Sequence, residues 1–278
     1  MLVGIVALLL ERLKVKSVAI KPESARFIST AYDAAINKLK KNFPPRQELD
    51  PTKVKSLVSP KMFKYISKLA KQKSQPKLTP IEKIQWKYNV SPKISNIILQ
   101  MPKPISKKHI IHNKKIPIKT RLAIQYNVMT HIPRKMITRL IKILPSKTTI
   151  AGSYRRGLAF SSDVDILTST PLDKYISDLK SRLKIRIYEQ GESKVSCLVK
   201  KGGLVFKLDI FRETDGIADL LFLTGSKEHN LKMRKKAKAL GLKLNRYGLF
   251  KNTTKLKYTS EEDIFKLLGM KYVKPSDR

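Results

Sequence analysis

Apolar residues recur at helical spacing, three or four positions apart, through much of the segment between residues 16 and 115. The pattern is clearest in residues 27–39 and again in residues 62–69. Prolines interrupt it, and because proline has no amide proton it favours the first turn or the end of a helix. The N-terminal part of the chain therefore predicts several short helices.

The first ten residues are apolar and as long as the core of a signal peptide. They have neither a basic leader nor a small-residue cleavage site, and Glu11, Arg12 and Lys14 end the stretch too early for a membrane span. We expect this stretch to be a buried element of the fold or the product of a misassigned start.

Strand-like alternation replaces the helical pattern further along the chain. Within residues 205–211, three apolar side chains occupy one face, while Lys207 and Asp209 occupy the other. The same two-residue period places Asp163 and Asp165 on one face of a strand. The apolar residues that alternate with them then face a core. The sequence therefore predicts two strands, each with an apolar face and an opposite face that carries carboxylate groups.

Three carboxylates on two neighbouring strands predict a metal site. Asp163 and Asp165 repel each other unless a cation lies between them, and Mg²⁺ prefers a few carboxylates together with substrate phosphates. With Asp209 added, the set suits two-metal phosphoryl transfer, in which one ion activates a hydroxyl and the other neutralises leaving pyrophosphate. A lone Asp-x-Asp pair would more often be an exposed, solvated decoration of a strand.

A glycine turn upstream of the acidic pair strengthens the metal interpretation. Gly152 permits a tight turn, and amides at a helix start can face phosphate oxygens. Arg156 can add a bidentate, charge-assisted contact to the same phosphates. Gly152-Ser153 followed by Asp163 and Asp165 is typical of a nucleotidyltransferase.

The charge balance indicates a polyanionic partner. The chain has 59 Lys and Arg against 21 Asp and Glu, a formal net charge of +38 over 278 residues. Codon bias in an AT-rich genome would enrich lysine, but it should enrich glutamate as well. Attraction to nucleic acid is therefore the favoured explanation. Membrane-surface binding is a weaker alternative, because no basic amphipathic helix with aromatic anchors stands out.

A short internal repeat lies in the helical region. Residues 57–66 echo residues 89–98 at an offset of 32, and each copy places Ser-Pro before an apolar helical pattern. Ser59 and Ser91 would begin helices whose free amides can bind a backbone phosphate. Chance is the alternative, since the identical run Val-Ser-Pro-Lys is only four residues long.

From about Ile118 to Arg278 the sequence closely resembles the family X DNA polymerases, the group of DNA polymerase beta, including small viral members. The resemblance extends beyond the acidic pair. It includes the Thr-Gly-Ser segment in residues 224–234, the hairpin in residues 245–250, and the ending from Glu262 to Arg278.

The resemblance implies a role for each matching residue. Metal ligands and catalytic residues would be Asp163, Asp165 and Asp209, with Asp209 also assisting deprotonation of the primer 3′-hydroxyl. Two Mg²⁺ ions are implied, for which Mn²⁺ can substitute. The nucleotide-binding residues would be Gly152, Ser153, Arg156, Ser162, Phe222, Leu223, Gly225 and Asn230. The DNA-binding residues would be Ser59, Lys61, Ser91, Lys93, Lys207, Arg234 and Tyr247.

Three positions depart from the family pattern near the nucleotide. Phe222-Leu223 stands where the family usually has Tyr-Phe against the sugar, so discrimination against ribonucleotides is in doubt. Lys227 replaces an Asp beside the incoming base, and His131 stands where an Arg approaches the terminal phosphate. We expect altered fidelity and sugar selectivity, with the chemistry retained.

The N-terminal region resembles the deoxyribose-phosphate lyase domain of polymerase beta, whose repeats are helix-hairpin-helix motifs that grip DNA. The motif glycines are absent here, and Tyr65 falls at the position of the Schiff-base lysine. A catalytic amine also needs a depressed pKa. We expect lyase activity to be absent or poor and 5′-phosphate binding to be retained. Candidate residues for either role are Tyr32, Lys61 and Lys64.

The expected fold class is α+β. We expect an N-terminal helical, helix-hairpin-helix-like domain, then a nucleotidyltransferase palm with a mixed β-sheet, then a C-terminal α/β closing subdomain. The predicted parts are a lyase-like or 5′-phosphate-binding domain (1–82), a helical DNA-binding connector (83–144), the palm (145–216), and a subdomain that binds the nascent base pair (217–278).

The predicted function is template-directed gap filling in DNA repair. Expected partners are dNTP and gapped or nicked duplex with a 5′-phosphate. We expect a monomer without membrane contact. The single Cys197 allows no internal disulfide, which fits a reducing intracellular location such as a nucleus, viral replication site or virion. The alternatives are a template-independent nucleotidyltransferase and a non-catalytic basic DNA-binding protein.

Overall fold

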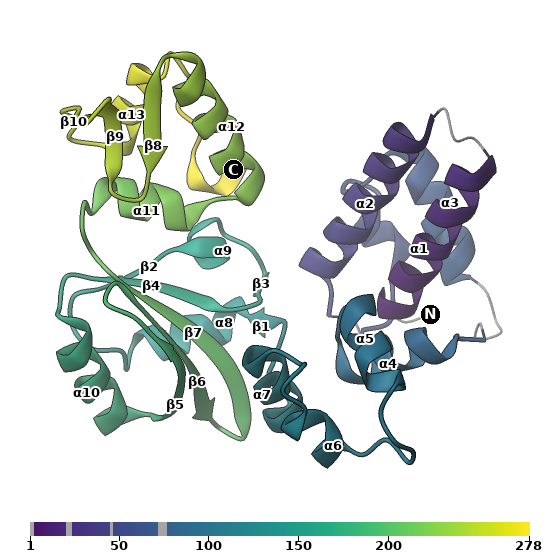
Figure 1. The fold of residues 1–278 in the computed structure, drawn as a ribbon. Coiled ribbons are helices and arrows are strands. Elements are labelled where there is room, and N and C mark those ends of the chain that lie inside the picture. The colour runs from purple at the N-terminus through teal and green to yellow at the C-terminus, as the bar shows by residue number, and fades with distance from the viewer. Residues whose placement is uncertain (1–2, 21–23, 45–46, 72–76) are drawn as a thin grey trace. The chain divides into compact units, whose positions relative to one another are not determined.

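The computed structural model describes residues 3–20, 24–44, 47–71 and 77–278. The chain divides into two compact units, Met1–Asn127 and Val128–Arg278 (Figure 1). The division falls inside the predicted 83–144 connector, and the four-part organisation inferred from the sequence stays a prediction. Each unit has its own hydrophobic clusters.

The N-terminal unit is helical over its described residues. Its elements are α1 (Val3–Ile20), α2 (Ala25–Asn42), the 3₁₀ turn η2 (Pro51–Val54), α3 (Pro60–Ala70), α4 (Pro80–Tyr88), α5 (Pro92–Leu99), α6 (Lys107–His112) and α7 (Ile118–Tyr126). One apolar cluster joins α1, α2 and α3, and a second joins the helices from α4 to α7.

The opening apolar stretch begins α1. Val6 and Leu10 are fully buried in the first cluster, so the expected buried element is confirmed, whereas Met1 and Leu2 lie outside the described residues. Among the helices described, none combines the length and apolar character that a membrane crossing requires.

The 32-residue repeat produces the same local structure twice. Pro60 and Pro92 occupy the first turns of α3 and α5, where a missing amide proton costs nothing. The hydroxyls of Ser59 and Ser91 accept hydrogen bonds from the backbone amides of Met62 and Ile94, both at 3.4 Å. The predicted Ser-Pro helix starts are confirmed.

A mixed five-stranded sheet organises the first part of the C-terminal unit. Strand order is β2-β4-β7-β6-β5, and only the β4–β7 pair is parallel. The elements in this part are β1 (Ile132–Pro133), α8 (Arg134–Ile141), β2 (Thr148–Ile150), α9 (Gly152–Arg155), β3 (Phe160–Ser161), β4 (Val164–Thr168), α10 (Leu172–Arg182), β5 (Lys184–Gln190), β6 (Lys194–Lys201) and β7 (Leu204–Arg212). The predicted α+β class with a mixed sheet is confirmed.

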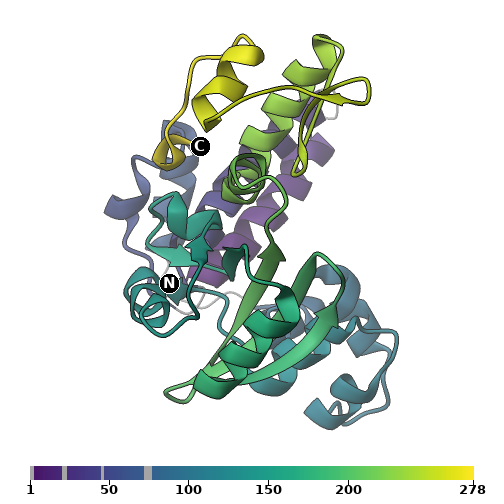
Figure 2. The ribbon, with the colours of Figure 1, turned by 90° about the vertical axis from the view of Figure 1, so that its left-hand side faces the viewer.

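One face of this sheet packs against α8 and α10, and Figure 2 shows α10 running beside the long strands. Tyr175 of α10 is fully buried there, and Cys197 of β6 is a buried free thiol. The opposite face carries the acidic residues.

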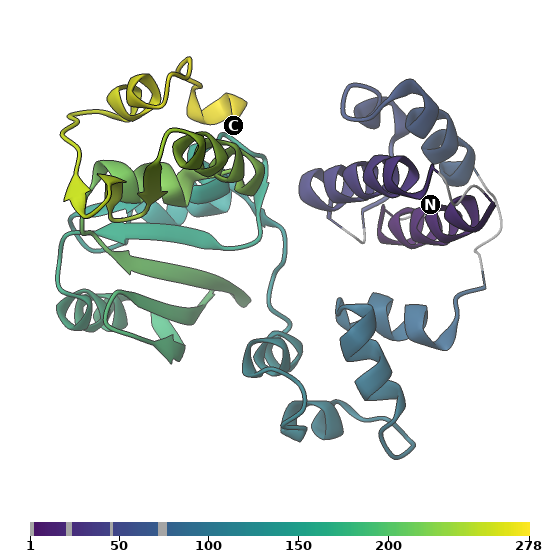
Figure 3. The same ribbon diagram turned by 45° about the horizontal axis from the view of Figure 1, so that its top comes forward.

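The last third of the C-terminal unit is a smaller α/β layer. Figure 3 shows α11 and α12 on the side of the strands away from α10. Its elements are α11 (Ile217–Thr224), α12 (Lys227–Ala239), β8 (Leu242–Asn245), β9 (Gly248–Lys251), β10 (Thr254–Lys255), α13 (Glu261–Leu267) and the 3₁₀ turn η3 (Pro275–Asp277). Its core includes Met233 and Ala237, which lie four residues apart on the buried side of the basic helix α12.

Candidate active site

The parallel β4–β7 pairing brings the three predicted carboxylates to one place. Asp165 on β4 lies directly opposite Asp209 on β7, and Asp163 immediately precedes β4. Val164 and Leu208, which alternate with them, are buried in the core on the other face. The predicted separation of acidic and apolar faces is therefore confirmed.

Two of the three carboxylates have positively charged partners. Lys207 Nζ donates to Asp163 Oδ2 at 2.8 Å, and Lys194 Nζ lies 3.3 Å from Asp209 Oδ1. The Asp165 carboxylate forms no hydrogen bond or ion pair with any residue in the described ranges. It lies between the other two and has the least compensation.

Burial, together with the charges of the nearby Asp163 and Asp209 carboxylates, raises the pKa of Asp165 to about 7. A cation held among the three would favour the ionised form. Over the described ranges, no three His, Cys, Asp or Glu side chains are gathered as they would be around a bound metal; Asp163 and Asp209 are directed to lysines. An oxygen-only donor set with excess negative charge nevertheless suits a hard cation such as Mg²⁺.

Gly152 begins α9 directly beside Asp165. Its φ is +59°, and a Cβ at this position would collide with the Asp165 carboxylate. Any larger residue would therefore displace the acidic group as well as strain the backbone. The next residue, Ser153, donates from its hydroxyl to Ser161 Oγ at 2.7 Å. The backbone turn at Gly152 is therefore packed directly against the Asp165 carboxylate.

An open pocket of about 460 Å³ lies in front of these residues, between the sheet and the α11–α12 layer. All eight predicted nucleotide-binding residues line it: Gly152, Ser153, Arg156, Ser162, Phe222, Leu223, Gly225 and Asn230. Asp163, Asp165, Lys227 and Arg234 line it as well, and Leu231, which the sequence did not indicate, completes the wall. The volume is that of a small-molecule site.

Arg156 and Asn230 each bond to the end of α11. Arg156 Nη1 donates to the Thr224 carbonyl, and Asn230 Nδ2 donates to the Phe222 carbonyl at 2.7 Å. Burial lowers the pKa of Arg156, and its Nε is buried without a hydrogen-bond partner among the described residues. Arg156 also lines the pocket, so its positive charge borders the same space.

A charged bridge that the sequence did not indicate connects α9 with α13. Arg155 Nη1 donates to Thr224 Oγ1 at 2.7 Å and to Glu261 Oε1 at 2.8 Å. The C-terminal residue completes it, since Arg278 Nη2 donates to Glu261 Oε2 at 2.6 Å. No local sequence signal could have found contacts between residues more than a hundred positions apart.

The remaining predicted residues of this unit lie away from the pocket wall. Asp209 and Lys207 are on β7 beside the acidic pair but do not line the pocket. Tyr247 follows β8, is 49% exposed and lies 5.4 Å from the Arg246 guanidinium, measured to its ring centroid. His131 lies against Phe160 in a T-shaped ring contact at 6.2 Å.

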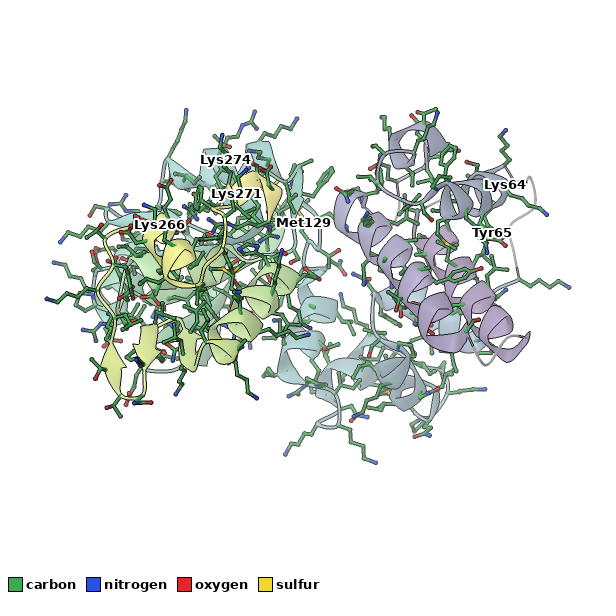
Figure 4. The ribbon with its side chains drawn as sticks, turned by 90° about the horizontal axis from the view of Figure 1, so that it is seen from above. Lys64, Tyr65, Met129, Lys266, Lys271 and Lys274 are labelled. Atoms are coloured by element: carbon green, nitrogen blue, oxygen red, sulfur yellow. The ribbon has the colours of Figure 1, made fainter. Side chains whose placement is uncertain are left out.

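The candidate residues of the N-terminal unit divide into exposed and buried ones. Lys61, Lys64 and Lys93 are exposed, and Lys64 extends from the surface of α3 (Figure 4). Tyr32 is only 4% exposed and stacks on Tyr65 with ring centroids 6.3 Å apart. Both tyrosines contribute to the first apolar cluster, so the exposed lysines are the better placed for contact with a phosphate.

Comparison with known proteins gives a consistent result. The family model "DNA polymerase beta thumb" matches residues 219–278. The "Repair DNA polymerase X" of African swine fever virus is 33% identical over 181 residues, covering 61% of this chain and 98% of the viral protein. "DNA polymerase IV" of Saccharomyces cerevisiae is 37% identical over 86 residues, covering 30% of this chain and 15% of the yeast protein.

Solved structures share the fold. The polymerase beta of Leishmania infantum, in a ternary complex with gapped DNA, superposes with a TM-score of 0.60 at 22% identity. The match covers 77% of this chain and 95% of the Leishmania chain. At this identity the likeness concerns the fold alone.

Proposed function

We propose that this chain, which belongs to family X of the DNA polymerases, fills short gaps in duplex DNA during repair. As a DNA-directed DNA polymerase it would add a templated dNTP to the 3′-hydroxyl of a primer. One observation carries the proposal: the pocket next to the β4 carboxylates is lined by all eight residues predicted to bind the nucleotide. Acidic groups for metal and basic groups for phosphate border the same space.

Each residue has a chemical task in this proposal. Asp163, Asp165 and Asp209 would hold two Mg²⁺ ions, which supply activation of the 3′-hydroxyl and neutralisation of the leaving pyrophosphate. Arg156 lines the pocket while its Nη1 holds α11, so its guanidinium would offer its charge and its remaining N–H groups to the triphosphate. Ser153 would add a hydroxyl contact to the same phosphates. Mn²⁺ can replace Mg²⁺ at such oxygen sites.

The far wall of the pocket would select the nucleotide. Phe222 is 37% exposed and half-buried Leu223 lies next to it, where the sugar of a bound nucleotide would pack. Asn230 would approach the incoming base and Arg234 the template, while Tyr247 would support the closed subdomain. With Leu223 in place of an aromatic ring, discrimination against ribonucleotides should be relaxed.

The N-terminal unit would grip the DNA around the gap. The starts of α3 and α5, capped by Ser59 and Ser91, would bind backbone phosphate together with exposed Lys61 and Lys93. Lys61 and Lys64 would contact a 5′-phosphate without lyase chemistry. The preferred substrate is then a gapped or nicked duplex with a 5′-phosphate, bound by a monomer, at a nucleus, viral replication site or virion.

Primer extension on a one-nucleotide gap with a 5′-phosphate tests the proposal. Wild type and Asp209→Ala are compared in Mg²⁺ and in Mn²⁺, with each dNTP and rNTP supplied singly. We expect the templated nucleotide to be added by wild type and lost in the variant, with measurable ribonucleotide addition. Addition that ignores the template would indicate a tailing enzyme. Tight, salt-sensitive binding without addition would indicate a non-catalytic DNA-binding protein.

A further inference from the structure

A serine on β6 lies directly against the third carboxylate. In the antiparallel β6–β7 register, Ser196 pairs with Asp209. Ser196 is completely buried, and its hydroxyl donates to Asp209 Oδ1 at 2.5 Å. Its neighbours Val195 and Cys197 point into the core on the other face. The hydroxyl therefore stands on the carboxylate side of the sheet, in the middle of the strand.

Burial makes this hydrogen bond obligatory. A hydroxyl removed from water without a partner costs free energy, so a buried serine keeps the acceptor that the fold provides. Here the acceptor is Asp209, itself only 7% exposed. The buried hydroxyl of Tyr188 on β5 lies near the same serine and carboxylate.

The donors converge on one oxygen of the carboxylate. Ser196 Oγ and Lys194 Nζ both approach Oδ1 of Asp209, at 2.5 and 3.3 Å. Within the described residues, no donor approaches Oδ2. Oδ1 is therefore fixed from within the sheet, and the strand register places this carboxylate beside Asp165 on β4.

Ser196 and Lys194 contribute differently to this arrangement. Lys194 is about one-third exposed, its Nζ also lies 3.7 Å from Glu189, and its charge offsets that of the carboxylate. Ser196 is neutral, rigidly placed by the strand, and closer. A neutral donor orients a carboxylate while leaving the negative charge that a cation requires.

We propose that Ser196 is a positioning residue that holds Asp209 in the rotamer needed to bind metal and receive the 3′-hydroxyl proton. The inference rests on the proposed function, because Asp209 must be a metal ligand for its orientation to matter. Ser196 touches neither substrate nor metal and acts only through Asp209. Losing it should leave the fold and nucleotide binding intact while weakening metal binding and turnover together.

Two substitutions and a matched control test this role. Ser196→Ala removes the hydroxyl at nearly constant volume, Ser196→Thr keeps it on a residue that strands tolerate, and Cys197→Ala truncates the next buried residue of β6 on the core face. We expect Ser196→Ala to lower kcat on gapped DNA about 10- to 100-fold. KM for dNTP should change by less than about 2-fold, and Ser196→Thr should restore most of the rate.

Metal binding is measured separately, without turnover, by titrating Mn²⁺ into each protein and following the midpoint of thermal unfolding. Ser196→Ala should need about 10-fold more Mn²⁺ for half of the maximal stabilisation, while Cys197→Ala follows wild type. The Mn²⁺ titration can be interpreted even if wild type is inactive on gapped DNA. The role of Ser196 and the proposed polymerase function are therefore tested separately. An unchanged Mn²⁺ requirement in Ser196→Ala would overturn the assignment. So would equal losses of kcat in Ser196→Ala and Cys197→Ala that track their losses of stability.

Discussion

In the C-terminal unit the carboxylates of Asp209 and Asp219 lie inside the fold, whereas in the N-terminal unit the lysines along α3 lie on its surface. Asp209 is 7% exposed and Asp219 is fully buried, and each accepts hydrogen bonds from named neighbours. By contrast, α3 buries Met62, Ile66 and Leu69 and turns a row of exposed lysines outward. That row is Lys61, Lys64, Lys68 and Lys71.

Because of this difference, the two units should respond differently to the loss of a charged side chain. A buried carboxylate or guanidinium depends on a few fixed partners, so one substitution should cause a large and specific loss. A surface lysine acts through a shared field that salt screens, so single losses should be small and graded. We expect chemistry to be sensitive to substitutions in the C-terminal unit and affinity to be sensitive to those in the N-terminal unit.

The largest effect is expected from Asp165→Asn, which removes the least compensated carboxylate. Turnover on gapped DNA should fall on the order of 10³-fold or more, because metal binding and transition-state charge stabilisation are both lost. DNA affinity should stay within about 3-fold of wild type, since no phosphate contact is removed. Single-turnover kinetics and a binding titration separate the two.

The same variant should be more stable than wild type without metal. The pKa of Asp165 is raised to about 7 in the fold, so the folded state binds this proton more tightly than the unfolded chain. Stability should therefore fall as pH rises from about 4 to 7, by up to about 4 kcal/mol. Asp165→Asn should melt several degrees higher than wild type at pH 8 and nearly equally at pH 4. Equal melting at pH 8 would contradict this.

The next largest effect is expected from breaking the Arg155–Glu261–Arg278 bridge. The Arg278 side chain is fully buried and that of Glu261 is 10% exposed, so Arg278→Ala would leave a buried carboxylate with one partner. We expect a loss of about 3 kcal/mol, measured by denaturant unfolding. Lys266→Ala is the matched control, because the side chain of Lys266, which is labelled in Figure 4, is 77% exposed and its Nζ lies 3.8 Å from Asp263 Oδ1. It should cost less than about 0.5 kcal/mol; equal costs would refute the contrast.

A smaller, graded effect is expected on the surface of α3. Lys64→Glu with Lys68→Glu should weaken binding to gapped DNA and reduce the log–log salt slope by about 1 for each phosphate contact removed. Thermal stability should hold or rise, because each new glutamate stands three residues from a lysine, Lys61 or Lys71, and opposite charges at that spacing on a helix attract. Lys174→Glu with Lys180→Glu on α10 makes the same change in net charge on the outer side of the sheet. Equal weakening by both pairs would mean that only total charge matters.

The smallest effect is expected at the helix starts. Ser59→Ala and Ser91→Ala each remove an N-cap and should each cost about 1 kcal/mol, measured by thermal unfolding. DNA affinity should fall further than stability alone explains if these helix starts bind phosphate. A loss of stability with unchanged affinity would restrict the repeat to a structural role.

The periodicity of the sequence predicted most of the features that depend only on residues close together in the chain. The faces of β4 and β7, the buried Cys197 and the Ser-Pro helix starts all follow from spacing within a few residues. The nucleotide-binding residues required the family resemblance, since nothing local connects Gly152 with Asn230. The pairing of Ser196 with Asp209 depends on strand register, and that of Arg155 with Glu261 depends on packing across 106 positions, so neither could be read from the chain.

Single-turnover incorporation into a one-nucleotide gap, measured over a range of enzyme concentrations, tests the central contrast most directly. It gives the rate of the bound complex and the affinity for DNA from one experiment. For Asp165→Asn we predict a lost rate at unchanged affinity, and for Lys64→Glu with Lys68→Glu a lost affinity at an unchanged saturating rate. If the variants of both units lost rate and affinity in proportion, this would contradict the assignment of chemistry to the C-terminal unit and of DNA binding to the N-terminal unit.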